Sequence, residues 1–172
     1  MKKILSLLIL PLFLFSVSAA EEKIIFKFTE NELSELQVRK VRGADSKTIY
    51  TIGNNENGNY LKAVADNSAS GLGKEIVIDL DETPFINITW KVEKDLKGIK
   101  ENTKKGHDFA ARIFVIKKTG ATILSNRAIN YVYSSNMNID EYMPSPYTKK
   151  SIDYVLSTTK INFDEWVTVK AN

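Results

Sequence analysis

The sequence predicts an all-β protein, folded as an antiparallel β-sandwich. Short segments rich in β-branched and aromatic residues recur along the chain, and turn-forming residues separate them at close spacing. Apolar residues hardly ever recur with the 3.6-residue period of an amphipathic helix. No internal repeat and no linker-like stretch interrupts the pattern. We therefore expect a single β-sandwich domain over residues 21–172.

Residues 1–20 are predicted to be a secretory signal peptide. Lys2 and Lys3 form a short positive segment, an apolar run continues to Val17, and small residues then fit a cleavage site. The run is too short for a membrane span, and Glu21-Glu22-Lys23 follows it at once. The mature chain is therefore expected in the periplasm or outside the cell.

Composition excludes several classes of site. The 172 residues include no cysteine, which rules out disulfides, thiolate metal ligands, a cysteine nucleophile and the acceptor of a lipoprotein anchor. Loss of Lys2 and Lys3 with the signal peptide lowers the formal charge from +3 to +1. A nearly neutral chain without a basic cluster gives no electrostatic reason to expect binding to nucleic acid or to an anionic membrane. We expect no membrane anchor.

The N-terminal half is expected to contain one helical turn and one clear hairpin. Thr29 or Asn31 is suited to cap a turn within residues 29–36. Asn and Gly residues at 54–59 predict a tight turn between two strands, because these residues tolerate positive φ.

Strands are expected on both sides of these features, over residues 24–28, 36–41, 48–52, 60–65 and 75–81. In the last of these, Ile76, Ile78 and Leu80 alternate with acidic residues and are expected to face inward.

The C-terminal half contains the cleanest strand, residues 85–93, with Ile86, Ile88, Trp90 and Val92 on one face. Residues 106–117 predict a central strand covered on both faces, because the run is long, apolar and rich in β-branched and aromatic residues. Residues 143–147 predict an irregular loop, since two prolines two residues apart do not fit inside a ladder. The remaining strands are expected over residues 129–133, 154–157 and 166–171.

Asp108 and Arg112 are the leading candidates for function, because they share one face of the expected central strand. Buried charges usually pair, so the interpretation we favour for these two is a structural ion pair. The functional alternative makes the Arg112 guanidinium a donor for a carboxylate or a sugar hydroxyl. Lys91 and Glu93, on the polar face of the neighbouring strand, would complete such a site or simply form a solvated face.

Tyr147 and His107 are the other candidates. Tyr147, in the proline-containing loop, is the aromatic residue best placed to stack on a sugar ring. His107, the only histidine, is either a general base beside Asp108 or a cap of the loop that enters the strand, and we favour the cap. No calcium-binding motif is present; a structural calcium at the sandwich edge stays open, and no other cofactor is expected.

Five ordered motifs resemble an uncharacterised bacterial exported family, domain of unknown function 3047. They are Ser68-Ala69-Ser70-Gly71-Leu72, Ile88-Thr89-Trp90-Lys91-Val92, His107-Asp108-Phe109-Ala110-Ala111-Arg112-Ile113-Phe114-Val115, Ile129-Asn130-Tyr131-Val132-Tyr133 and Ser145-Pro146-Tyr147-Thr148. No activity is established for that family. The resemblance implies a fold similar to galactose-binding-like jelly rolls, in which a late strand opens as Trp166-Val167-Thr168-Val169 does here.

The chain departs from the family at its C-terminus. Members continue past this late strand through an Asp-rich stretch to a final strand, whereas this sequence stops at Asn172. The resemblance therefore implies a sandwich that lacks its last strands and has an open sheet edge.

The leading functional expectation is a non-catalytic β-sandwich that binds a carbohydrate or another glycan of the cell envelope, through Lys91, Glu93, Asp108, Arg112 and Tyr147. It rests on analogy of fold. The enzyme alternative is a polysaccharide hydrolase that uses paired carboxylates such as Asp108 and Glu93. The third is a structural envelope protein whose exposed sheet edge pairs with a partner chain.

Overall fold

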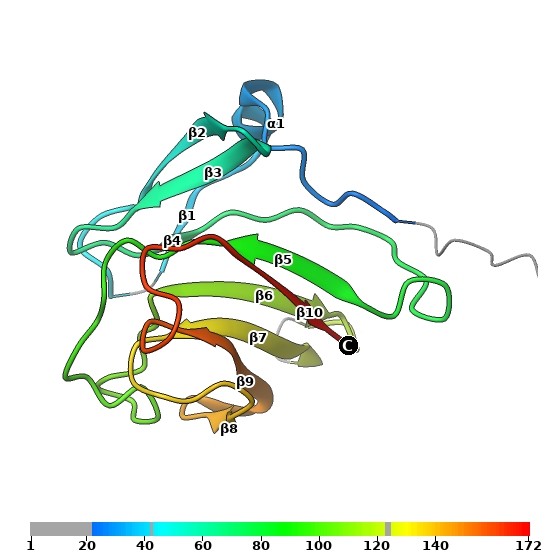
Figure 1. The fold of residues 1–172 in the computed structure, drawn as a ribbon. Helices are drawn as coiled ribbons and strands as arrows, with labels where there is room; N and C mark the ends of the chain where they lie inside the picture. The colour runs from blue at the N-terminus through cyan, green and yellow to red at the C-terminus, as the bar shows by residue number, and fades with distance from the viewer. Residues whose placement is uncertain (1–21, 42, 123–124) are drawn as a thin grey trace, which may run out of the picture. The chain divides into compact units, whose positions relative to one another are not determined.

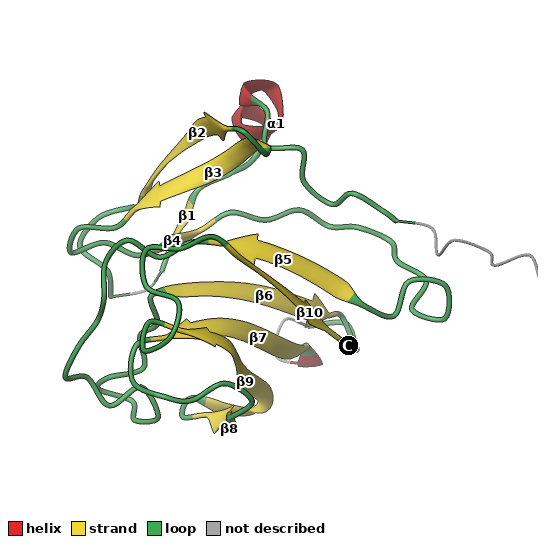
Figure 2. Cartoon of the chain, in the orientation of Figure 1, coloured by secondary structure: helices red, strands yellow, loops and turns green. Residues whose placement is uncertain are grey.

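The computed structural model describes residues 22–41, 43–122 and 125–172, so the predicted signal peptide lies outside the described residues. Strands account for nearly all the regular secondary structure of the described chain (Figure 2), which confirms the all-β class. The chain divides between Pro84 and Phe85 into two compact units, and we describe each by itself. The single domain over residues 21–172 stays a prediction.

In the N-terminal unit, helix α1 (Glu30–Glu35) begins with the cap expected from the sequence. The Thr29 hydroxyl accepts a hydrogen bond from the Glu32 amide at 3.2 Å. The Glu32 carboxylate in turn accepts the amides of Lys27 and Phe28, each at 2.9 Å. This reciprocal arrangement satisfies backbone donors at the helix start and is a variant of the capping box.

The described part of the N-terminal unit also contains four strands. β2 (Ile49–Asn55) and β3 (Gly58–Val64) form the expected hairpin, and Gly58 adopts a φ of +108° at its turn (Figure 1). β1 (Arg39–Lys40) pairs with β4 (Ser70–Gly71). The strands expected over 24–28 and 75–81 do not form, so both predictions were wrong.

The C-terminal unit is built from two packed sheets. β5 (Ile86–Trp90) pairs with β10 (Val167–Ala171), and the second sheet has the order β6-β7-β9-β8. Its strands are β6 (Ala111–Lys117), β7 (Arg127–Ser134), β8 (Tyr142–Ser145) and β9 (Thr148–Thr158). The sandwich architecture is thereby confirmed, whereas the jelly-roll topology stays a prediction.

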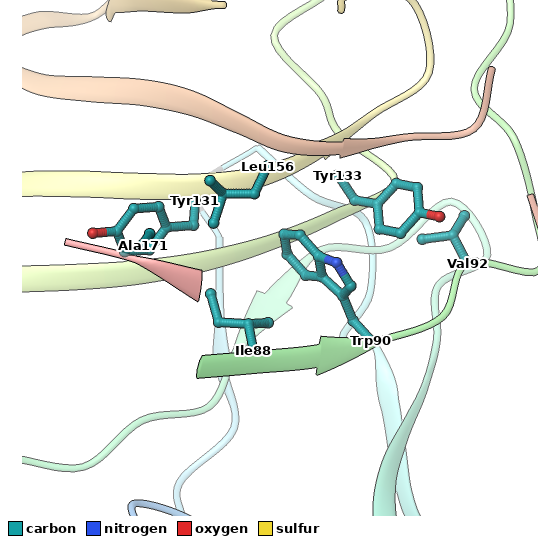
Figure 3. Close-up of a cluster of buried hydrophobic side chains, with 7 residues drawn as sticks. All are labelled: Ile88, Trp90, Val92, Tyr131, Tyr133, Leu156 and Ala171. Atoms are coloured by element: carbon teal, nitrogen blue, oxygen red, sulfur yellow. The ribbon is translucent and has the colours of Figure 1, made fainter. Parts of the chain in front are cut away.

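The core lies between these sheets. Figure 3 shows the Trp90 side chain pointing from β5 towards Leu156 and Tyr133 of the facing sheet. The Trp90 and Tyr133 ring centroids are 5.2 Å apart, and the indole N–H donates to the Ser157 hydroxyl at 2.9 Å. The inward face predicted for residues 85–93 is confirmed, because Ile88, Trp90 and Val92 are all buried.

The expected central strand was wrong in position and in burial. β6 begins at Ala111 rather than at Gly106 and is the edge strand of its sheet. Its residues Ile113 to Lys117 are exposed. The composition of an apolar run does not distinguish a buried central strand from an edge strand with exposed residues.

Two pairings also differ from expectation. β7 and β9 run parallel, with a register shift between Val132 and Tyr133, whereas the sequence predicted antiparallel pairs. The loop expected over 143–147 overlaps β8, which includes Pro144. Pro144 is accommodated because β8 is an edge strand with a bulge at that position.

Candidate functional site

The loop from Asp95 to Ala110 carries part of the candidate site, and buried polar groups hold it in place. Glu101 is only 2% exposed. Its carboxylate accepts hydrogen bonds from the Ser134 hydroxyl and from the amides of Ser135, at 2.8 Å, and Asn136, at 3.3 Å. Three donors from the end of β7 thus compensate the burial of this charge.

The last residues of the loop fix the position of His107. A Cβ atom on Gly106 would lie 2.6 Å from the Lys100 carbonyl oxygen, so only glycine fits this turn. Phe109 is buried against Val132 and Val155, on the face of the four-stranded sheet opposite the Trp90 core. The amide of Ala110 then donates to the Tyr133 carbonyl at 3.1 Å and starts the edge strand.

His107 forms a buried pair with Asp153, a residue of β9. The imidazole Nε2 lies 2.7 Å from Asp153 Oδ2, and the two side chains are 4% and 0% exposed. Asn130 of β7, opposite Asp153 in the register, donates to Asp153 Oδ1 at 2.8 Å and to the Ser151 hydroxyl at 2.9 Å. Both oxygens of Asp153 are therefore occupied as acceptors.

Arg112 lies on β6, on the same face of the sheet as this network. Its guanidinium carbon is 4.6 Å from the ring centroid of Phe109 and 5.4 Å from that of Phe114. Within the described parts of the chain it makes no hydrogen bond and no ion pair. Burial lowers the pKa of Arg112, while the charges of Asp153 and Asp108 act in the opposite direction.

Two exposed aromatic side chains lie near the Arg112–His107 region. Phe114 is 54% exposed and Tyr147 is 65% exposed. Tyr147 is held by its hydroxyl, which donates to the Lys104 carbonyl at 2.8 Å, and its ring packs edge-on against His107 at 5.4 Å. Exposed aromatic rings are suited to contact an apolar surface of a ligand.

An open hollow of about 280 Å³ lies further along the same face. It is lined by Ile116, Asn126, Arg127, Ala128, Thr148, Lys150 and Ser151. Ser151 connects it to the buried network, because its hydroxyl accepts the hydrogen bond from Asn130.

The structure brings together some of the predicted site residues and places others elsewhere. Arg112, Asp108 and Tyr147 interact electrostatically. Asp108 itself is exposed, and its carboxylate accepts the Phe109 amide at 3.0 Å. Lys91 instead pairs with Asp164 at 2.8 Å and Glu93 at 3.6 Å.

Sequence reasoning missed Asn130, Asp153 and Glu101. A signal was available for the first two. Asn130 stands in an apolar run, Ile129 to Tyr133, and Asp153 precedes the buried Val155 at the same strand parity. A polar residue at a buried strand position needs a polar partner, and each of these two is the other's partner.

Among the residues that the structure describes, no group of three or more His, Asp or Glu side chains comes together as a metal site. No helix within that part of the chain has the length and apolar character to cross a bilayer.

Asp95, at the start of the loop, provides a pH-dependent test of how the loop is held. Burial by itself would raise the pKa of Asp95, but hydrogen bonds with Ser135 and Thr159 and the charge of Lys97 hold it below its ordinary value of 3.8. The folded pKa is depressed, so this stabilisation is present above pH 3.8 and is lost as the pH falls through the folded pKa.

We expect Asp95→Asn to lower the free energy of unfolding at neutral pH and to lose this effect in acid. Urea unfolding of both proteins across this pH range measures the difference. A difference that stays constant with pH would show that the Asp95 charge contributes nothing.

No curated protein matches the chain, and no solved structure matches it. The family model described as protein of unknown function (DUF3047) matches residues 34–172, which is most of the chain. The chain therefore belongs to this DUF3047 family.

Proposed function

We propose that this protein is exported and binds a glycan of the cell envelope without catalysis. The proposed site is one face of the four-stranded sheet, formed by Arg112, Phe114, Ser151 and Tyr147, and we call it the Arg112 face. Export rests on the sequence of residues 1–20, and glycan binding rests on the chemistry of this face.

The observation that carries the proposal is the state of Arg112. Its planar guanidinium is partly buried against Phe109 and has no hydrogen-bonding partner in the described chain. Placing a cation there costs desolvation free energy, and the charges of Asp153 and Asp108 offset this cost only in part. A ligand that presents oxygen acceptors, beside exposed rings that contact its apolar face, would compensate this cost.

The geometry favours binding over hydrolysis. Asp108 and Glu93, the carboxylates of the hydrolase alternative, are both exposed, and Glu93 lies beside Lys91. A general acid for glycoside cleavage needs surroundings that raise its pKa, usually an apolar pocket. The buried carboxylates, Asp153 and Glu101, are instead occupied by hydrogen-bond donors.

A second candidate function is partner binding through β6. This edge strand exposes Ile113, Phe114, Val115 and Ile116, and an apolar edge is a surface on which a strand of another chain can pair. A native pull-down from envelope extract that recovers no protein would count against this candidate.

Replacement of Arg112 by alanine tests the proposed function. We expect the dissociation constant for a bound envelope glycan to rise at least about tenfold, because charge-assisted hydrogen bonds contribute roughly 1.5–3 kcal/mol. Isothermal titration calorimetry measures the change, and recovery of the glycan uncleaved separates binding from hydrolysis.

Arg39→Ala, at an exposed arginine of the N-terminal unit, is the matched control and should bind like the unaltered protein. Equal affinity of all three proteins, with the thermal unfolding of the Arg112 variant unchanged, would remove the proposed site.

A further inference from the structure

We propose that the ligand of the Arg112 face is an acidic oligosaccharide, whose sugar carboxylate is bound by the Arg112 guanidinium. This inference rests on the proposed function and specifies the class of glycan. It follows from three features: the carboxylates around Arg112 already accept other hydrogen bonds, the guanidinium is held over an aromatic ring, and the face beyond it is elongated.

The carboxylates near Arg112 already have other partners. Asp153 accepts from His107 and Asn130, and Glu101 accepts from the residues at the end of β7. Asp108 accepts its own neighbour's amide and is exposed to water. These charges act on Arg112 without hydrogen-bonding to it, so its donors remain for an acceptor from outside.

The side chain is held in a way that suits a planar anion. The guanidinium lies over the ring of buried Phe109, at 4.6 Å, and near the ring of Phe114, at 5.4 Å. Such contacts restrict its orientation before a ligand arrives, and a fixed fork of N–H donors matches the two oxygens of a carboxylate. A neutral hydroxyl, with one oxygen, would accept fewer of these N–H donors than a carboxylate.

The Arg112 face is elongated along β6, so it suits a chain of sugar rings better than a single ring. Arg112, Phe114 and Ile116 are alternate residues of β6, so they span about 13 Å along the strand. Exposed Phe114 lies between Arg112 and the hollow that begins at Ile116. Ser151 lines this hollow, and its hydroxyl, which accepts from Asn130, can still donate to a ligand oxygen.

The hollow itself suits further acidic rings. Arg127 and Lys150 are among the residues that line it. Its volume of about 280 Å³ is near the lower end of ordinary small-molecule sites, roughly 300–1,000 Å³. An oligosaccharide with a carboxylate on more than one ring would therefore place one carboxylate at Arg112 and another near Arg127 and Lys150.

The test compares three probes with the same backbone: tetragalacturonic acid, its methyl ester, and the neutral galactose tetramer. Calorimetry with the full chain should show binding of the acid, with the ester and the neutral tetramer weaker by about tenfold or more. Added salt should weaken binding of the acid, because part of the attraction is between exposed charges.

Two variants locate the effect. Arg112→Gln, which keeps hydrogen-bonding groups and removes the charge, should reduce the preference for the acid over its ester to near one. Lys62→Gln, at an exposed residue of the N-terminal unit, should leave the preference unchanged.

The failure of this inference is distinguishable from the failure of the proposed function. Equal affinity for the acid, the ester and the neutral tetramer, lost in Arg112→Ala, would overturn the acidic class and leave glycan binding in place. Binding of none of the three, together with no binding of mannuronate and glucan tetramers, would overturn both.

Discussion

Asp153→Ala is expected to lower the free energy of unfolding by about 3–5 kcal/mol, because it removes one partner of a buried pair. His107 would lose the one hydrogen-bond acceptor that its ring has in the described chain, at 2.7 Å, and would have to remain buried unpaired or leave its position. One of the two acceptors of the Asn130 amide would also be lost. Chemical denaturation with urea measures the difference.

Asp108→Ala is the matched control for this variant. Asp108 also lies near Arg112, but it is exposed. Its removal is expected to change stability by about 0.5 kcal/mol or less, as is usual for surface substitutions. If Asp153→Ala and Asp108→Ala lowered the free energy of unfolding equally, the stability would depend on negative charge near Arg112 and not on the buried His107–Asp153 pair.

Trp90→Ala is expected to have an effect of similar size, about 3–5 kcal/mol, through loss of packing in the core. Trp90 is 7% exposed and contacts the ring of Tyr133 between the two sheets. Its removal would leave a cavity at the centre of the sandwich and would leave the Ser157 hydroxyl without its donor. Thermal and urea unfolding both report this loss.

Trp90→Phe separates the packing of the ring in the core from the hydrogen bond to Ser157. Phenylalanine keeps an aromatic ring in the core but cannot donate to Ser157, so a smaller loss is expected, from one hydrogen bond and the reduced ring volume. A small loss in both variants would show that the contact between the sheets is not the main source of stability in the C-terminal unit.

The parts of the fold that the sequence predicted correctly are those with a local signal. The cap at Thr29 and the Asn-Gly turn of the β2–β3 hairpin depend on residues close together in the chain. The buried face of β5 was predictable because strict alternation fixes which residues share a face.

The errors concern relations between distant segments. Residues 75–81 alternate as a strand should, yet Leu80 is 64% exposed, because alternation does not supply a neighbouring strand to pair with. The edge position of β6 and the parallel pairing of β7 with β9 depend on the order of strands in the sheet, which composition does not encode.

The candidate site was predictable only where its residues have a local signal in the sequence. Arg112 and Tyr147 were identifiable as a charge in an apolar run and as an aromatic residue in a turn. The partner of His107 is 46 residues away in the sequence, so its neighbour Asp108 was considered in place of Asp153. Lys91 was assigned to the site by strand parity, but the structure pairs it with Asp164.

The central claim is that ligand binding occurs on the Arg112 face. Its most direct test is an NMR titration of the isotope-labelled chain with tetragalacturonic acid, which follows the guanidinium signal of Arg112 and the amides of Phe114 and Ser151. We expect these signals to shift together and to saturate, with the amides of Lys91 and Glu93 unchanged. Saturable shifts centred on Lys91 and Glu93, with Arg112 unaffected, would contradict the account.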